Sequence, residues 1–282
     1  MKISRQITAT TAGSAIELLA AQVPELAKAR LKDAMQKGAV QLLTKPVKRL
    51  RRAQFMLNPG AKLALHYDAE LLQRQCSPAR LLFDLRDYSI WFKPPGMLSQ
   101  GNEWGDHLSL VRYAEQHLQP ARPIFLLHRL DREASGLVML AHNKKAAAAL
   151  SKLIAQQQIN KTYWIRVKGQ LAADLQSQAV IRQSLDGKAC ESRFRVLRYD
   201  ANQDYSECEV QLITGRKHQI RRHFAAVGHP VLGDPQYGKG NKSASGLALQ
   251  AIALGFNCPL TRRQQHFTLP ASYYFDVLQS GL

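Results

Sequence analysis

The succession of strand-like and helix-like segments after residue 80 constrains the fold of this chain more than any other feature. Strand composition, either rich in aromatic and β-branched residues or alternating polar and apolar, recurs in four segments: Tyr88–Lys93, Leu137–Ala141, Thr162–Lys168 and Ser206–Ile213. One alanine-rich segment, 144–157, is expected to form a helix. Because these segments do not alternate strictly as strand, helix and strand, we expect an α+β fold whose larger domain has a mixed, largely antiparallel sheet flanked by helices.

The net charge points to a polyanionic partner. The chain has 282 residues, and 39 Lys and Arg against 21 Asp and Glu give it a formal net charge of +18. Half of this excess lies in the first 80 residues, which carry 14 basic and 5 acidic residues. A chain this basic is typical of proteins that bind nucleic acid; the alternative is a basic surface that is only solvated.

The first 77 residues have the pattern of a small separate unit. Helical periodicity covers 14–21 and 26–38, and short strands are predicted at 39–43 and 62–67. This order resembles the S-four-like RNA-binding module, named after a small-subunit ribosomal protein; the alternative is an unrelated αβ cap. A dense basic turn separates the two strands: Lys45, Lys48, Arg49, Arg51 and Arg52. The polar segment 73–78 reads as a linker, so we expect one domain over 1–77 and a second over 78–282.

The cysteines and the N-terminus favour a reducing compartment. None of the four cysteines forms a Cys-x-x-Cys pair, so neither a disulfide framework nor a zinc cage is expected. The N-terminus has no continuous apolar stretch like that of a signal peptide, and no apolar run reaches about twenty residues. We therefore expect a cytoplasmic protein with no membrane association.

Three separated segments carry residues suited to chemistry, and the first is 127–140, LHRLDREASGLVML. Asp131 lies between Arg129 and Arg132, and two flanking cations favour the ionised carboxylate that a nucleophile needs. The alternative is a structural ion pair at the start of a strand. The second segment is 160–169, where Tyr163 and Trp164 point to opposite faces of a strand. A tyrosine there could stack on a base or transfer a proton, or be an ordinary strand aromatic.

The third segment is 212–238, LITGRKHQIRRHFAAVGHPVLGDPQYG. A helix is expected over 216–226, beginning after the turn at Thr214–Gly215, and its N-terminus with nearby arginines would attract phosphate or carboxylate. The arginines at 216, 221 and 222 are not expected to be buried without acidic partners. Three histidines and Asp234 lie here, but no His-x-x-x-His pair occurs and the arginines would repel a cation, so no metal site is expected.

Taken together, these motifs resemble the RluA-type family of pseudouridine synthases, over about residues 85–278. The resemblance rests on four motifs in the family's order. They are Lys-Pro-Pro-Gly at 93–96, His-Arg-Leu-Asp with Ser-Gly-Leu at 128–137, Lys-x-Tyr at 161–163, and Thr-Gly-Arg-x-His-Gln-Ile-Arg with Gly-His-Pro-x-x-Gly-Asp-x-x-Tyr-Gly at 214–238. One departure is visible, because the family usually has Thr where this chain has Ala134.

The resemblance implies the function and the site. Asp131 would be the catalytic nucleophile, Arg221 the arginine that pairs with it and Tyr163 the active-site tyrosine near the base. Arg129 would occupy the space left by the flipped uridine, and Ile220 would pack beside the uracil. Arg216 would contact the site or a phosphate, and His128 and Lys93, within the matching motifs, are further candidates for substrate binding.

The implied reaction is the isomerisation of uridine to pseudouridine in a structured RNA, with ribosomal RNA favoured and transfer RNA open. Isomerisation involves no redox change and no net water, so no cofactor is expected, and a monomer is expected. One alternative is a non-catalytic RNA-binding or ribosome-assembly protein. Another is a nuclease, which would need metal-binding carboxylates or a histidine pair that this sequence does not organise.

Overall fold

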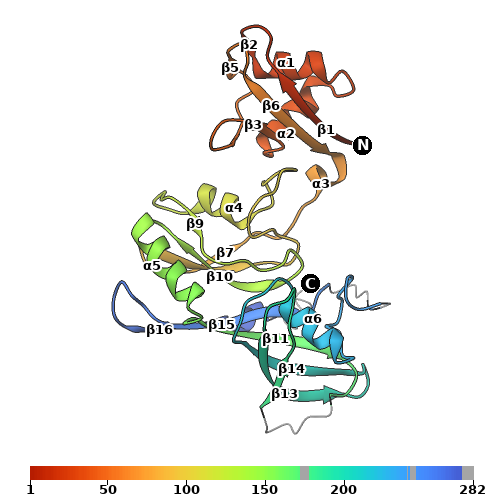
Figure 1. Ribbon diagram of the computed structural model, residues 1–282, viewed down its shortest axis with the longest axis vertical. Helices are drawn as coiled ribbons and strands as arrows, with labels where there is room; N and C mark the ends of the chain where they lie inside the picture. The colour runs from red at the N-terminus through yellow and green to blue at the C-terminus, as the bar shows by residue number, and fades with distance from the viewer. Residues whose placement is uncertain (172–177, 240, 242–245, 275–282) are drawn as a thin grey trace. The chain divides into compact units, whose positions relative to one another are not determined.

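The computed structural model describes residues 1–171, 178–239, 241 and 246–274 (Figure 1). The chain divides into two compact units, Met1–Cys76 with Gln100–Leu118, and Ser77–Ser99 with Gln119–Leu282. The sequence-based boundary near residue 77 did not anticipate that 100–118 would belong to the N-terminal unit. None of the helices in the described part of the chain is long and apolar enough to cross a membrane.

The N-terminal unit is a small sheet packed on helices. Its four-stranded sheet has the order β1-β6-β3-β4 with antiparallel pairs, and β2 pairs separately with β5. Strand β1 was not predicted, although it pairs along its whole length with β6. The elements are β1 Lys2–Thr8, β2 Gly13–Ser14, α1 Ala15–Gln22, α2 Lys28–Gln36, β3 Val40–Leu42, β4 Lys48–Arg49, β5 Met56–Leu57, β6 Lys62–Asp68, α3 Ala69–Gln73 and α4 Leu110–His117.

Two arginines of the predicted basic turn are used inside this unit. Arg51 binds the Asp106 carboxylate at 2.5 Å, and Arg49 donates to the carbonyl oxygens of Gly38 and Asn102. These contacts hold the segment 100–118 against the end of α2, so Arg49 and Arg51 are not available as open phosphate contacts. The remaining cations of the turn are exposed: Lys45, Lys48 and Arg52.

The second unit is built on one large mixed sheet, which confirms the α+β prediction. Its strands follow the order β12-β13-β14-β11-β15-β10-β8-β7, with β16 beside β15 and β9 beside β10. The pair β10–β15 is parallel, and the other strand pairs of this sheet are antiparallel. The elements are β7 Arg80–Asp84, β8 Tyr88–Lys93, β9 Phe125–Leu126, β10 Ser135–Ala141, α5 Lys144–Ala155, β11 Asn160–Lys168, β12 Ala179–Arg182, β13 Glu191–Asp200, β14 Tyr205–Leu212, α6 Gln219–Ala226, β15 Leu249–Asn257, β16 Gln264–Thr268 and the 3₁₀ turn Ala271–Tyr273.

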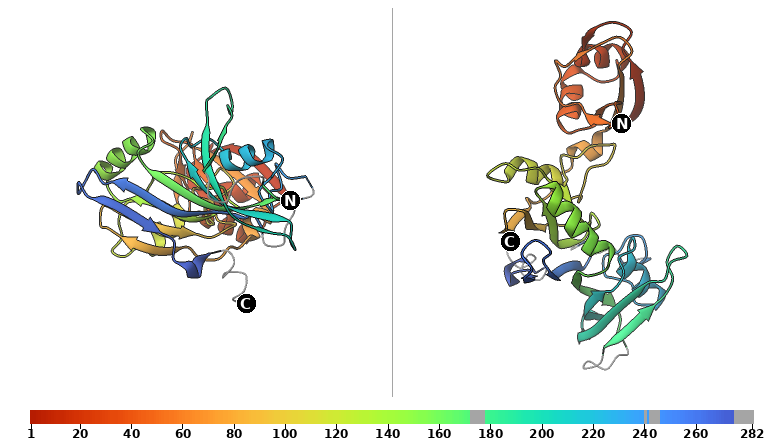
Figure 2. Two further views of the ribbon diagram at one scale, coloured as in Figure 1. Left: turned by 90° about the horizontal axis from the view of Figure 1, so that it is seen from below. Right: turned by 60° about the vertical axis from the view of Figure 1, so that its left-hand side comes forward.

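The centre of this sheet places the candidate motifs. Strands β8 and β10 are buried along their whole length. Gly136 of β10 has φ +113°, and a Cβ there would lie 2.2 Å from the Ala251 carbonyl oxygen, so glycine permits the close approach of β10 and β15. Helix α5 contacts β10 and α6 contacts β13, so the helices cover different parts of the sheet (Figures 1 and 2).

Candidate active site

Buried polar groups hold the backbone of the loop that carries Asp131. The Lys93 ammonium is fully buried and donates to the carbonyl oxygens of Ala134 at 2.6 Å, Met97 at 2.8 Å, Pro94 at 3.0 Å and Arg132 at 3.3 Å. An ammonium has three protons, so these carbonyls saturate it. Lys93 therefore supports the loop, and its expected role in substrate binding stays a prediction.

A buried hydroxyl makes a second support for the same loop. The Ser99 hydroxyl donates to the Leu130 carbonyl at 2.8 Å and accepts the Leu130 N–H at 2.9 Å. Both side chains are almost fully buried. The backbone on either side of Asp131 is thus anchored at Leu130 and at Ala134.

Asp131 is paired with an arginine from a distant part of the chain. Its Oδ2 accepts a hydrogen bond of 2.8 Å from Nη1 of Arg221, while the Asp131 side chain keeps 25% of its surface exposed. The neighbouring arginines do not supply this contact: Arg132 binds Glu133 at 2.8 Å, and Arg129 is exposed with no ion pair among the described residues. The direct partner of Asp131 is therefore Arg221, as the family resemblance implied, and not an arginine beside it in the sequence.

Arg221 joins two carboxylates in a buried cluster. Its Nε and Nη2 bind Asp234 at 2.7 and 2.8 Å, and only 4% of the Arg221 side chain is exposed. Burial by itself would lower the pKa of Arg221, but hydrogen bonds to Asp234 and Asp131 outweigh burial and raise that pKa above its usual range. The Tyr237 ring lies 5.2 Å from the guanidinium carbon. Arg221 is thus a permanent cation aimed at Asp131.

The turn before α6 places Arg221, and it differs from the prediction. The helix begins at Gln219 rather than at 216, because His218 has left-handed backbone angles of φ 54° and ψ 29°. The buried Gln219 side chain accepts from the Thr214 hydroxyl at 2.8 Å and the Arg216 N–H at 3.1 Å. Arg216 therefore lies on an exposed turn outside the helix.

Tyr163 and Ile220, two further predicted site residues, are both buried. Tyr163 is 7% exposed, and burial, followed by the negative charge of Asp131, raises the pKa of its hydroxyl above the usual range. The tyrosine is therefore a neutral group close to the carboxylate, able to stack or to donate a proton. Ile220 precedes Arg221 on α6 and is 3% exposed.

His128 lies behind the site as a neutral imidazole. Its Nε2 accepts the Met139 N–H at 3.0 Å, which ties the motif to β10. Burial, and secondarily the Lys161 ammonium, lower the pKa of His128 to about 3. Because the backbone occupies the nitrogen that accepts, His128 holds the motif to β10, and its expected contact with substrate stays a prediction.

The burial of His128 predicts that the free energy of unfolding falls at acid pH. Between pH 6.5 and 3 an unfolded His128 binds a proton that the folded side chain does not, so its contribution to stability is lost as pH falls through this window. The loss is expected to reach about 1.4 kcal/mol per pH unit at most. In His128→Gln an amide oxygen can accept the Met139 N–H without titrating, so urea unfolding at pH 7 and pH 5 should show a smaller loss than in wild type. Equal losses in both proteins would contradict the assignment.

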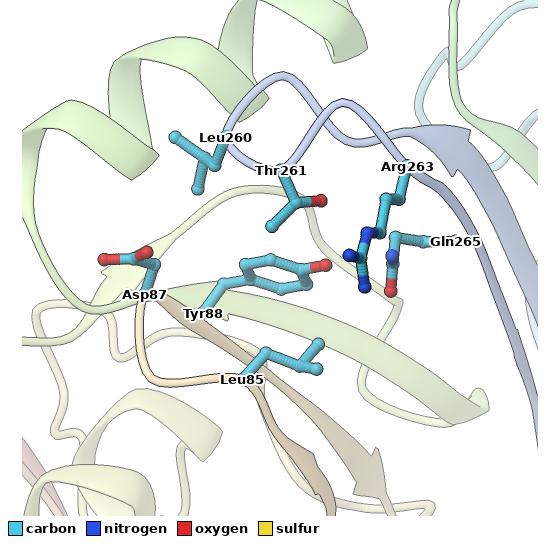
Figure 3. Close-up of a pocket in the computed structure, with 7 residues that line it drawn as sticks. All are labelled: Leu85, Asp87, Tyr88, Leu260, Thr261, Arg263 and Gln265. Carbon is cyan, nitrogen blue, oxygen red and sulfur yellow. The ribbon is translucent and has the colours of Figure 1, made fainter.

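The structure brings together Asp131, Arg221 and Tyr163, buries Ile220 beside Arg221 in the sequence of α6, and leaves Arg129 and Arg216 on the surface. In the described part of the chain no group of three or more His, Cys, Asp or Glu side chains is arranged to hold a metal ion. A separate pocket of about 410 Å³ lies between the β7–β8 turn and the β15–β16 hairpin and contains none of these residues (Figure 3). Its lining residues are Leu85, Asp87, Tyr88, Leu260, Thr261, Arg263 and Gln265.

Sequence reasoning did not assign three residues that the structure adds to the site. Asp234 is the bidentate partner of Arg221. The Tyr237 ring lies near the same guanidinium, and the Tyr237 hydroxyl is hydrogen-bonded to His218. All three belong to the third motif, so the signal was present, but Asp234 and His218 were weighed only as metal ligands. Pairing across thirteen residues, from within α6 to the loop that follows it, is not visible in spacing alone.

Comparisons with known proteins bear on the family of this chain. The family model described as RNA pseudouridylate synthase matches residues 87–226. The chain is 30% identical over 204 residues to the dual-specificity RNA pseudouridine synthase RluA of Vibrio vulnificus, which covers 66% of this chain and 80% of that protein. It is 27% identical over 284 residues to the ribosomal large subunit pseudouridine synthase D of Zymomonas mobilis, which covers 88% of this chain and 87% of that protein.

A solved structure shares the fold. Human RNA pseudouridylate synthase domain containing 1 matches with a TM-score of 0.60 and 20% sequence identity, covering 73% of this chain and 89% of that one. This likeness concerns the fold alone. The motifs and the sequence relatives carry the assignment further: the chain belongs to the RluA-type family of RNA pseudouridine synthases, isomerases that act on uridine in RNA.

Proposed function

We propose that this enzyme isomerises uridine in ribosomal RNA in the cytoplasm, as a monomer, and that Asp131 is the nucleophile acting on a base flipped out of its stack. The observation that carries the proposal is the Asp131–Arg221 pair of 2.8 Å. One carboxylate oxygen is held by a buried cation, while the Asp131 side chain keeps 25% exposure towards a substrate. This arrangement places an accessible carboxylate beside a buried cation, as a nucleophile in this role requires.

The chemistry needs only groups that this chain supplies. Isomerisation breaks the N1–C1′ bond, joins C5 to C1′, removes the proton from C5 and leaves one on N1, so atoms and electrons balance without an oxidant or added water. Asp131 can attack the ribose, attack the uracil ring or remove a ribose proton, and each route requires its ionised form. Tyr163, neutral and close to Asp131, is suited to stack on the base or donate a proton.

Two exposed arginines are placed to offset the free-energy cost of flipping a base. Taking a base out of its stack costs a few kcal/mol. Arg129 is exposed beside Asp131, where its planar cation can fill the space that the uridine leaves. Arg216, on the exposed turn before α6, can contact a phosphate, and Ile220 supplies an apolar contact for the uracil.

The direct test uses RNA whose uridines carry tritium at C5. Isomerisation releases this tritium to water, whereas simple binding releases none and strand cleavage leaves shorter fragments. We expect release from RNA of cells that lack this protein. Mapping pseudouridine in such cells identifies the target, and the relative named as a ribosomal large subunit enzyme makes large-subunit RNA the first substrate to examine. Loss of a site confined to transfer RNA would overturn the ribosomal assignment.

The basic turn of the N-terminal unit should contribute phosphate contacts. Lys45, Lys48 and Arg52 are exposed, whereas their neighbours Arg49 and Arg51 are held internally. Replacing all three exposed cations with Gln is expected to reduce the slope of log K against log salt by about two, since each contact to single-stranded RNA contributes about 0.7. Filter binding at several salt concentrations measures the slope.

A matched control separates local contacts from net charge. Lys144, Lys145 and Lys152 are exposed on α5, so their replacement with Gln changes the net charge by the same amount. The slope is expected to stay near the wild-type value in this control. If both triple variants lowered the slope equally, the basic turn would have no special role in RNA binding.

A further inference from the structure

His218 has an unusual backbone at the entrance to the site. It is the residue before α6, and its φ of 54° lies in the left-handed region that side chains other than glycine rarely adopt. Such a strained conformation persists where surrounding contacts fix it. Here the next residue, Gln219, is anchored by hydrogen bonds to the Glu191 carbonyl at 3.0 Å and the Ser192 hydroxyl at 3.1 Å. The fold therefore maintains a strained turn that presents an imidazole.

The strained turn directs the imidazole at the free side of Asp131. Nε2 of His218 lies 3.6 Å from Oδ1 of Asp131, the oxygen that Arg221 does not bind. Nδ1 of His218 lies 3.0 Å from the Tyr237 hydroxyl, whose ring meets the imidazole edge to face at 5.7 Å. When the phenol donates to Nδ1, the proton of the neutral imidazole must be on Nε2, facing Asp131.

The surroundings favour the neutral imidazole. Burial, the first cause, lowers the pKa of His218, and the positive charges of Arg221 and Lys217 act in the same direction. Asp131 and Asp234 oppose this effect without reversing it. A neutral imidazole can donate one hydrogen bond to Asp131 without cancelling the negative charge of the carboxylate. An imidazolium would neutralise the group that has to react.

We propose that His218 is a positioning residue that holds Oδ1 of Asp131 through Nε2–H, with its tautomer set by the hydroxyl of Tyr237. The separation of 3.6 Å is just beyond a hydrogen bond, and polar contacts in active sites commonly shorten when substrate is bound. With Arg221 on one oxygen and His218 on the other, the rotation of the Asp131 carboxylate and the direction in which it faces the substrate are both fixed. This inference rests on the proposed role of Asp131.

The test is the tritium-release rate of the full chain, with kcat and KM measured for three variants. His218→Asn tolerates the left-handed backbone but is too short to reach Asp131, so we expect kcat to fall about 10- to 100-fold with KM within about threefold. His218→Gln places an amide N–H near the position of Nε2 and should recover part of that loss. Tyr237→Phe keeps the ring beside Arg221 and loses only the hydroxyl, so a smaller fall in kcat, about 3- to 10-fold, is expected.

Combining the substitutions tests whether Tyr237 acts on Asp131 through His218. If Tyr237 acts through His218, Tyr237→Phe should have no further effect in the His218→Asn protein. Independent, multiplicative effects of the two changes, or an unchanged kcat in His218→Asn, would overturn the proposal. So would a Gln variant no better than Asn. Failure of the underlying role of Asp131 looks different, because Asp131→Asn would then retain activity whatever the His218 variants do.

Discussion

Asp131→Asn is expected to abolish isomerisation while leaving RNA affinity within a few-fold of wild type. The amide has the shape of the carboxylate but not its charge, and it can still accept a hydrogen bond from Arg221, 2.8 Å away in wild type. Losing an essential nucleophile typically lowers kcat by far more than 10²-fold, so we expect residual tritium release below about one per cent. Single-turnover assays at saturating enzyme measure the chemical step directly.

The neighbouring acid provides a matched control for this substitution. Glu133→Gln removes a carboxylate two residues away that pairs with Arg132 at 2.8 Å, and both of those side chains are partly exposed. Surface pairs of this kind contribute about 0–1 kcal/mol, so near wild-type turnover is expected. If Asp131→Asn kept more than about one per cent of the activity, Asp131 would not be the nucleophile.

Arg221→Met is expected to impair both stability and turnover. Asp234 has no exposed surface, and its remaining partners within the described structure are the backbone N–H groups of Gln236 and Tyr237. Removing one partner of a buried pair costs roughly 3–5 kcal/mol, because the other charge stays behind unsatisfied. Urea unfolding measures this loss, and kcat should fall at least about 100-fold in protein that remains folded.

A conservative substitution tests whether positive charge alone is enough at position 221. Arg221→Lys should rescue only partly, since one ammonium cannot reproduce three hydrogen bonds shared between two carboxylates. If Arg221→Met raised only KM and softened the salt dependence, Arg221 would be an RNA contact and Asp131 would need another partner.

Several features of this protein followed from the sequence because they depend on local chemistry. The strand Tyr88–Lys93 was predicted with its observed bounds, and its proline–proline–glycine ending explains why it stops there. The mixed sheet followed from the order of the segments. The motifs around residues 131, 163 and 221 were enough to indicate the family, since each keeps its residue types at fixed spacing.

What only the tertiary structure decided was how the charged groups are held. The family resemblance paired Arg221 with Asp131, ninety residues away, but the second carboxylate on that guanidinium, Asp234, is visible only in the fold. Lys93 was placed in the site by its motif, yet burial commits its ammonium to four backbone carbonyls. Hydrogen bonds and ion pairs of this kind depend on distance and desolvation, which arise only when β8, β10 and α6 are packed into one unit.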